Sequence, residues 1–297
     1  MIARRSKIMA LFALSLGAAS CAPSIPRDQV QQANAAYEAV AAASGPVLDE
    51  LSIAERRTFA RTLVSPKAAR DGDIVVPIAF EAKSAAYFAT IGDPVLTASL
   101  RRGLDAIRDY FKLLAALADG QNVDQVKAQV NVLAGSVSGL VAVATGGAAL
   151  PIAAIANELA PIIDQLIQAE NAKELRRLVL EGEPIFKSLI AALQEASGTM
   201  YETLTRGPMR AVRTNLADNE EARHAAFVQM ADLNISLSNY VILLGKLDDT
   251  MSALAAAVRT PGSALALSAV AASANNVLIE AHAASQTLVL IKTGRAP

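Results

Sequence analysis

The amino-acid sequence predicts an all-α protein: an elongated antiparallel helical bundle with long coiled-coil-like C-terminal helices and a central apolar helical hairpin. Hydrophobic residues make up 53% of the 297 residues, whereas aromatic residues make up 4% and tryptophan is absent. A core of alanine and aliphatic side chains is typical of close-packed helices rather than of sheets. Two further observations support the prediction: an uncharged stretch at 128–157 and a heptad that begins at Met230.

The first 20 residues form a predicted signal peptide. Basic residues up to Lys7 precede the apolar run 8–16, which is too short for a stable transmembrane helix. Small residues follow, and Cys21, the single cysteine of the chain, comes directly after Ser20. This end of the chain resembles the bacterial lipoprotein signal, in which small residues precede the cysteine that receives the lipid.

The resemblance covers residues 1–21 and implies cleavage between Ser20 and Cys21, with diacylglycerol and an N-acyl chain such as palmitate on Cys21. It therefore implies a lipoprotein of the bacterial cell envelope that faces the periplasm. Ala22, in place of aspartate after the cysteine, favours the outer membrane over the inner by the rule for enteric-type envelopes. The pattern departs at Ala18, where the lipobox usually has leucine, so ordinary secretion after Ser20 and an uncleaved anchor remain alternatives.

Behind the cysteine, residues 21–26 are a predicted lipidated tether, because Pro23 and Pro26 prevent helix formation. Residues 27–292 are predicted to form a single helical bundle domain, and 293–297 a frayed tail. The first helices are expected at 27–43 and 47–64, separated by Pro46, followed by an extended strap at 65–80 that contains Pro77. Helices should follow at 81–91 and 93–118, the second with Asp93 as its N-cap.

The stretch 128–157 contains no charged residue and is predicted to form two helical arms joined by glycines, the first arm extending from 123 to 145. Pro161 should kink the second arm. Gly135 and Gly139 have G-x-x-x-G spacing, which predicts close packing of a neighbouring backbone against this helix. The stretch is either a central hairpin buried by the other helices or a segment that enters a membrane. Glu158 and Asp164 in the second arm favour the buried hairpin, because acidic side chains are costly in hydrocarbon.

The C-terminal part carries the clearest helical pattern. Breaks are expected around Pro184 and at Gly207-Pro208, on either side of a helix at 184–205. A long helix should then run from about Asp218 to 259, and a last helix from 263 to 292. The apolar heptad positions of the long helix are Met230, Leu237, Leu244, Met251 and Val258 in one series and Leu233, Tyr240, Leu247 and Leu254 in the other. Those of the last helix are Leu267, Val270, Ala274, Val277, Ala281, Ala284, Leu288 and Ile291.

Motifs for catalysis, cofactors or metals are absent from the sequence. It contains neither glycine-rich phosphate-binding pattern, and Gly135 to Gly139 has valine where a nucleophile elbow needs serine. His224 and His282 lack metal-ligand spacing and are interpreted as surface residues. We therefore expect no catalytic residues, no metal and no cofactor apart from the lipid on Cys21. The net charge of −1 also disfavours binding to nucleic acid.

Arg206, Arg210 and Arg213 form a weak candidate site for an anionic headgroup or phosphate, although a solvated basic face paired with acids explains them as well. For the whole chain the sequence supports two functions. The first is a lipid-anchored envelope protein with a structural or protein-interaction role, whose partner the sequence does not identify. The second is a membrane-active protein that inserts 128–157, which resembles helical pore-forming toxins in general layout.

Overall fold

The computed structural model describes residues 27–62, 82–89, 91–144, 151–214 and 220–292. Within these ranges the chain is helical and has no strand, which confirms the all-α prediction. The signal peptide at 1–20, the tether at 21–26, the strap at 65–80 and the tail at 293–297 lie outside the described residues.

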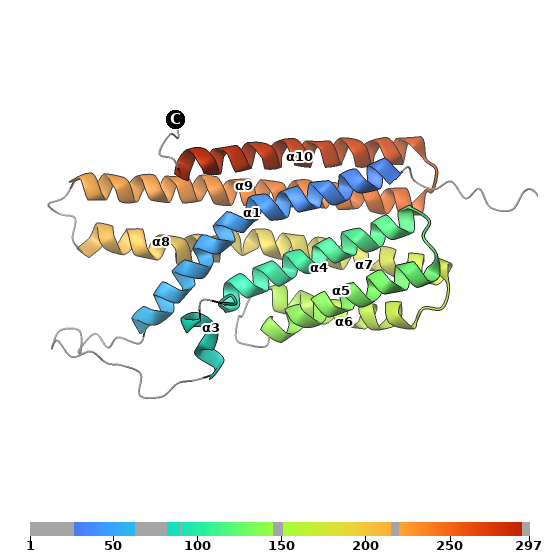
Figure 1. Cartoon of the computed structure of the whole chain (residues 1–297), viewed down its shortest axis with the longest axis horizontal. Helices are drawn as coiled ribbons and strands as arrows, with labels where there is room; N and C mark the ends of the chain where they lie inside the picture. Colours follow the sequence, from blue (N-terminus) through green and yellow to red (C-terminus); the bar gives the residue numbers. More distant parts are fainter. Residues whose placement is uncertain (1–26, 63–81, 90, 145–150, 215–219, 293–297) are drawn as a thin grey trace, which may run out of the picture.

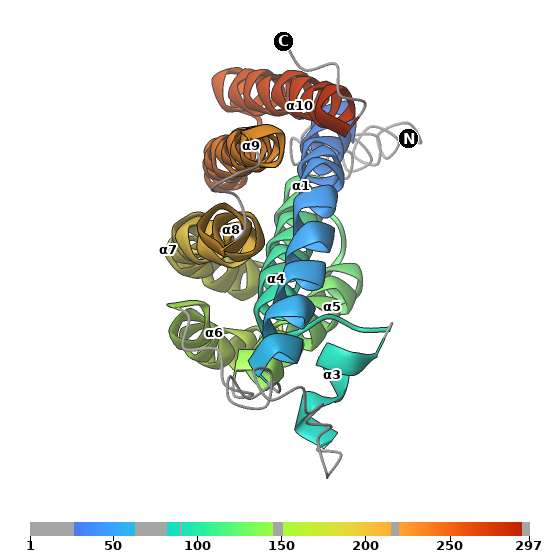
Figure 2. The same cartoon turned by 90° about the vertical axis from the view of Figure 1, so that its left-hand side faces the viewer.

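The helices form an elongated bundle in which the two C-terminal helices follow the long axis and the N-terminal helix crosses it obliquely (Figure 1). In chain order the elements are α1 (Arg27–Thr62), η1 (Ala82–Ser84), α3 (Ala85–Phe88), α4 (Val95–Ala118), α5 (Val123–Ala144), α6 (Pro151–Gln168), α7 (Ala172–Glu195), α8 (Ser197–Thr214), α9 (Glu220–Arg259) and α10 (Ala264–Lys292). Seen from the end, α10 lies at one edge of the bundle and the α5–α6 pair at the opposite edge (Figure 2).

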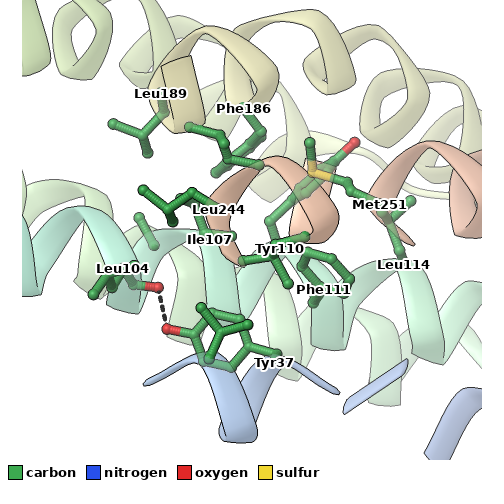
Figure 3. Packing of buried hydrophobic residues seen from close by; sticks show 14 of the residues in the cluster. Tyr37, Leu104, Ile107, Tyr110, Phe111, Leu114, Phe186, Leu189, Leu244 and Met251 are labelled. Carbon is green, nitrogen blue, oxygen red and sulfur yellow. Dashed lines mark hydrogen bonds between the residues drawn. The ribbon is translucent and has the colours of Figure 1, made fainter. Parts of the chain in front are cut away.

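Helix α4 lies in the middle of the bundle, where it packs against α1, α5, α7 and α9. Its Tyr110 ring stacks on Phe186 of α7 with 3.9 Å between the ring centroids. The Tyr110 hydroxyl donates a hydrogen bond of 2.8 Å to the carbonyl of Val179. Tyr37 of α1 donates one of 2.7 Å to the carbonyl of Leu104 (Figure 3). Burial raises the pKa of both tyrosines, so each hydroxyl stays a neutral donor inside the core.

The coiled-coil-like pattern of the C-terminal helices is confirmed. In α9 both predicted series face the core: Leu233 is half-buried and the other eight positions are buried. In α10, Leu267 is half-buried, and Val270, Ala274, Val277, Ala281 and Ala284 are buried against α1 and α9. The side chains of Leu288 and Ile291 lie outside the described residues. A 3.5-residue apolar repeat thus correctly identified the inner face of each helix.

Several breaks predicted at proline and glycine are wrong. Pro46 lies inside one continuous α1, Pro184 lies inside α7, and Gly207-Pro208 lies inside α8. The actual break in this region is at Ala196, between α7 and α8. Pro184 is exposed and Pro46 half-exposed, so water can hydrate the carbonyl group that each proline leaves without a partner, while the apolar stripe of the helix stays buried on its other side.

The start of α4 also differs from the prediction. Helix α4 begins at Val95, and Asp93 pairs with Arg101 at 3.0 Å instead of capping the helix. The cap comes from Glu55 of α1, whose carboxylate accepts hydrogen bonds from the backbone N–H groups of Leu96 (3.0 Å) and Thr97 (2.9 Å) and from the Thr97 hydroxyl (2.8 Å). The preceding helix, expected at 81–91, is reduced to η1 and the short α3.

The hairpin helices form as predicted, but their expected central position is wrong. Helix α5 packs on α4 and α6, and α6 packs on α5 and α7, at the edge of the bundle (Figures 1 and 2). Only one stripe of α5 is buried: Val126, Val130, Leu133, Val137 and Leu140. The stretch contains so much Ala, Gly and Ser that composition alone did not reveal which residues face inward. The glycine turn at 145–150 lies outside the described residues.

Candidate functional site

The outer side of α9 carries a second apolar stripe, opposite the heptad that faces the core. Val228, Ile235 and Ile242 are spaced by seven residues and are 46%, 42% and 50% exposed. We call these three residues the outer ridge of α9. Phe227, at 53% exposed, lies beside its first member. A helix with apolar residues on both sides normally has neighbours on both sides. The outer ridge is therefore the best candidate for a binding surface in the part of the chain that the structure describes.

A groove adjoins Ile242 of the outer ridge, on the side of α7 and α8. Its first part, of about 530 Å³, lies between the start of α8 and the middle of α9. Its second part, of about 360 Å³, lies between α7 and the next turns of α9. Small residues line both parts: Ser197, Gly198 and Ser238 in the first, and Ser188, Ala191 and Gly245 in the second. Because these side chains are short, the groove can admit the side chains or the backbone of another helix.

Polar contacts between α7 and α9 fix the width of this groove. The side-chain amide of Gln194, which lines the second part, donates a hydrogen bond of 3.0 Å to the carbonyl of Val241, which lines the first. Lys187 lies 3.4 Å from a carboxylate oxygen of Asp248 and donates to the Ser252 hydroxyl at 3.0 Å. Partial burial raises the pKa of Asp248, and Lys187 offsets part of that rise. These contacts hold α7 against α9 without covering the outer ridge.

Comparison with known proteins gives no relative: no family model, no curated protein and no solved structure matches this chain.

The structure tests the residues predicted from the glycine spacing but does not describe those predicted from the leader. Ser20 and Cys21 lie outside the described residues, so cleavage and lipidation remain predictions. The close packing expected at Gly135 is not found, because a Cβ atom built there meets nothing within 4 Å. A Cβ atom at Gly139 would lie 3.6 Å from the Arg102 side chain, which is an ordinary contact with a flexible side chain rather than with a backbone. The G-x-x-x-G stripe of α5 therefore does not mark a close helix–helix contact within the bundle.

The weak anion site gains no support from neighbouring groups. Arg206 and Arg210 are both exposed on α8, and the side chain of Arg213 lies outside the described residues. A small cavity of about 80 Å³ between α1, α8 and α9 is lined by Arg57 and Arg61, together with Glu50, but neither Arg206 nor Arg210 lines it. Arg206 and Arg210 therefore do not line this cavity together with Arg57 and Arg61.

The two histidines are both exposed, as expected for surface residues. The imidazole Nε2 of His282 lies 2.8 Å from the side-chain amide of Gln286, one turn along α10. Among the described residues, no group of three or more His, Cys, Asp or Glu side chains could hold a metal ion.

Sequence reasoning missed the buried charges that hold the bundle together. Besides Glu55, Glu183 of α7 is buried and pairs with Arg259 of α9. Asp109 of α4 is also buried, and it accepts hydrogen bonds from the Ser136 hydroxyl of α5 and from its neighbour Arg108. A signal was available in the sequence, because Glu55 and Glu183 each occupy an apolar stripe, seven residues after Leu48 and four after Val179 respectively. In each case the carboxylate joins two helices, so these residues serve the fold.

Two described helices are long and apolar enough to cross a membrane by length and composition. They are Val123–Val143 in α5 and Ala264–Thr287 in α10, with 28% and 22% of the most apolar window buried. Each helix covers one edge of the bundle and turns one face inward. An edge helix of a bundle that is not in a membrane can therefore be equally apolar and equally buried.

Proposed function

We propose that this chain is a non-catalytic, lipid-anchored helical bundle of the bacterial envelope that acts by binding another protein along the outer ridge of α9. The observation that carries the proposal is the outer ridge itself, together with the groove beside it. The core-facing heptad of α9 accounts for the packing of this helix within the chain. The fold therefore does not need the outer apolar stripe. Aliphatic side chains at seven-residue spacing beside a small-residue groove suit a helix of a partner protein.

The anchor in this proposal is the lipid on Cys21, with residues 22–26 as the spacer between the membrane and the first turn of α1. A short spacer would keep the bundle close to the membrane surface, where membrane-bound partners are concentrated. We propose no catalytic reaction, because the buried carboxylates already have structural partners. Glu55, Asp109 and Glu183 each bind a group of a neighbouring helix or residue. These groups are engaged in packing rather than turned toward a cleft.

Site-specific photo-crosslinking in intact cells tests the binding surface. A photo-reactive side chain at position 242 should give a discrete protein–protein product, because this position lies on the outer ridge. Position 279 is the matched control, since Ile279 is a similarly exposed isoleucine (59%) on α10. The same product from both positions, or none from position 242, contradicts the proposed surface.

A membrane-active role is the second candidate, and one observation favours it. The exposed positions of α5 from Ala128 onward, including Val132, Gly135, Ser138 and Ala142, are all uncharged. Against it, the exposed side of α6 carries Glu158 and Asp164 among other polar residues. In addition, the buried contact between Asp109 and Ser136 would have to break before α5 could leave the bundle.

Alkaline carbonate washing separates the two candidates. A chain exported behind an ordinary cleavable leader, without Cys21, should become soluble if the lipid is the anchor, while the wild-type chain stays with the membrane. If both proteins resist the wash, the hairpin inserts, and the interaction proposal loses its premise that the bundle stays intact.

A further inference from the structure

The outer ridge of α9 is one half of a self-complementary pattern. Small residues lie three positions after each member of the ridge: Ala231 after Val228, Ser238 after Ile235 and Gly245 after Ile242. Ala231 and Ser238 are exposed, and Gly245 is partly exposed beside Gln194. Large and small residues therefore alternate along the outer side of α9 in the a and d positions of a heptad.

An antiparallel pairing of two such helices places large residues against small ones. With a two-fold axis at the level of Tyr240, Ile242 of one copy lies opposite Ser238 of the second, and Ile235 lies opposite Gly245. Antiparallel coiled coils form layers in this way, from an a residue of one helix and a d residue of the other. A parallel pairing would place the isoleucines against one another and leave the small residues with a gap, which is a poorer fit.

Charge on the flank of the ridge selects the same register. Asp232, Asn239 and Lys246 share one flank of α9 at seven-residue spacing, and all three are partly exposed. Neither Asp232 nor Lys246 makes an ion pair within the part of the chain that the structure describes. In the antiparallel register each faces the opposite charge on the second copy, with Asn239 at the centre. Shifting the register by one heptad would instead place Asp232 near Asn239 and Lys246 near Ala225.

From these observations we infer that the partner of the outer ridge is a second copy of this chain, bound through α9 against α9 in antiparallel orientation. The inference rests on the proposed function and names its partner. The interface is isologous, because each copy contributes the same residues, so the association closes as a dimer and does not extend into a fibre.

The mass of the full chain, purified in mild detergent and measured by light scattering over a dilution series, tests the dimer. The wild-type chain and the Ile279→Glu variant should dimerise, whereas Ile242→Glu should be monomeric with an unchanged helical circular-dichroism spectrum. A wild-type chain that is monomeric throughout the series overturns the inference. So does an Ile279→Glu variant that dissociates as readily as Ile242→Glu.

Charge exchange tests the register without changing the apolar surface. Asp232→Lys and Lys246→Asp should each weaken the dimer, because each places like charges opposite one another. Mixing the two single variants should restore association as a heterodimer, since one variant then carries two lysines and the other two aspartates. A mixture that associates no better than either variant alone overturns the proposed register.

Cysteine cross-linking tests the orientation. In a Cys21→Ser background the introduced thiol is the only one in the chain. Asn239→Cys lies near the two-fold axis and should form an intermolecular disulfide, whereas Val228→Cys should not, because the two copies of position 228 lie at opposite ends of the interface. Cross-linking of Val228→Cys in place of Asn239→Cys contradicts the antiparallel arrangement. A chain that is monomeric by light scattering, yet cross-links from position 242 to a different protein in cells, refutes self-association and leaves the proposed function in place.

Discussion

The two sides of α9 are both apolar, yet they have different surroundings. On the inner side Leu244, Leu247 and Met251 are fully buried against neighbouring helices. On the outer side the members of the ridge remain about half exposed. Both stripes repeat every seven residues, so the helix has two surfaces suited to helix packing and the bundle uses one of them. A repeated apolar pattern therefore shows where a helix can pack, but not whether the neighbour belongs to the same chain.

The largest expected difference between these two sides is in the free energy of unfolding, when Leu247→Ala is compared with Ile235→Ala. Leu247→Ala leaves a cavity in the core and should lower the free energy of unfolding by about 2–5 kcal/mol. Ile235→Ala removes an exposed side chain and should change the unfolding free energy of the isolated chain by no more than about 0.5 kcal/mol. Denaturant unfolding, measured at concentrations where the chain is monomeric, compares the two. Equal losses would show that the outer ridge is part of the core.

The ion pair between the buried Glu183 of α7 and Arg259, at the end of α9, gives the next contrast. Glu183→Gln removes a charge-assisted contact and should lower the unfolding free energy by about 1–3 kcal/mol. The matched control is Glu181→Gln, because Glu181 pairs with Arg177 at 2.7 Å on the open side of the same helix. Exposed pairs contribute little, so the control should change stability by no more than about 0.5 kcal/mol. A control as damaging as Glu183→Gln would contradict this assignment of buried and open sides.

The cap that Glu55 provides for α4 should give a pH-dependent effect. Burial raises the pKa of Glu55 above its ordinary value of 4.5 despite three hydrogen bonds. The folded chain therefore keeps the proton to higher pH than the unfolded chain. Stability from this group is fully present below the unfolded pKa and declines as the pH rises through the raised folded pKa. Glu55→Gln should remove this dependence.

At neutral pH the same substitution should lower the unfolding free energy by about 1 kcal/mol, since an amide nitrogen cannot accept the hydrogen bond that one carboxylate oxygen accepts at the start of α4. Unfolding curves of wild type and variant across the acidic range provide the check. Parallel pH profiles would mean that Glu55 does not titrate differently in the folded and unfolded chains.

The smallest expected change in stability comes from replacing a glycine on the open side of a helix or one on a covered side. Gly135→Ala on the open side of α5 should raise the unfolding free energy by about 0.5–1 kcal/mol, because alanine favours the helix and its Cβ atom meets nothing within 4 Å. Gly103→Ala in α4 places a Cβ atom 3.0 Å from Leu193 and should lower stability. Thermal unfolding of both variants distinguishes these signs. A destabilising Gly135→Ala would restore the close-packing interpretation of the G-x-x-x-G stripe.

Much of this fold could be predicted from the sequence, because local patterns determine helices and their buried faces. The heptads of α9 and α10 identified the correct inner residues, such as Leu244 and Val277. The breaks at Pro46, Pro184 and Pro208 failed because a proline in a helix costs a limited amount that burial of the continuing stripe can exceed. The Glu55 cap and the edge position of α5 depend on residues distant in sequence, which no local pattern contains.

The binding surface was only partly accessible to the same reasoning. The sequence indicated a protein-interaction role but directed attention to Arg206, Arg210 and Gly135 rather than to the outer ridge. The second stripe, Val228, Ile235 and Ile242, is visible in the sequence as a heptad. It could not be identified as an outer stripe until the structure showed which apolar series of α9 faces the core.

The most direct test of the outer ridge as a binding surface is the rate at which a thiol at position 242 reacts with a soluble maleimide in intact envelopes. The native Cys21 is kept, because the anchor must be present and a lipidated cysteine has no free thiol, and Ile279→Cys provides the exposed reference. If another protein covers the ridge, Ile242→Cys should react slowly in the envelope and rapidly in dilute purified chain, whereas Ile279→Cys should react rapidly in both. Equal, rapid reaction of both variants in the envelope would contradict the account.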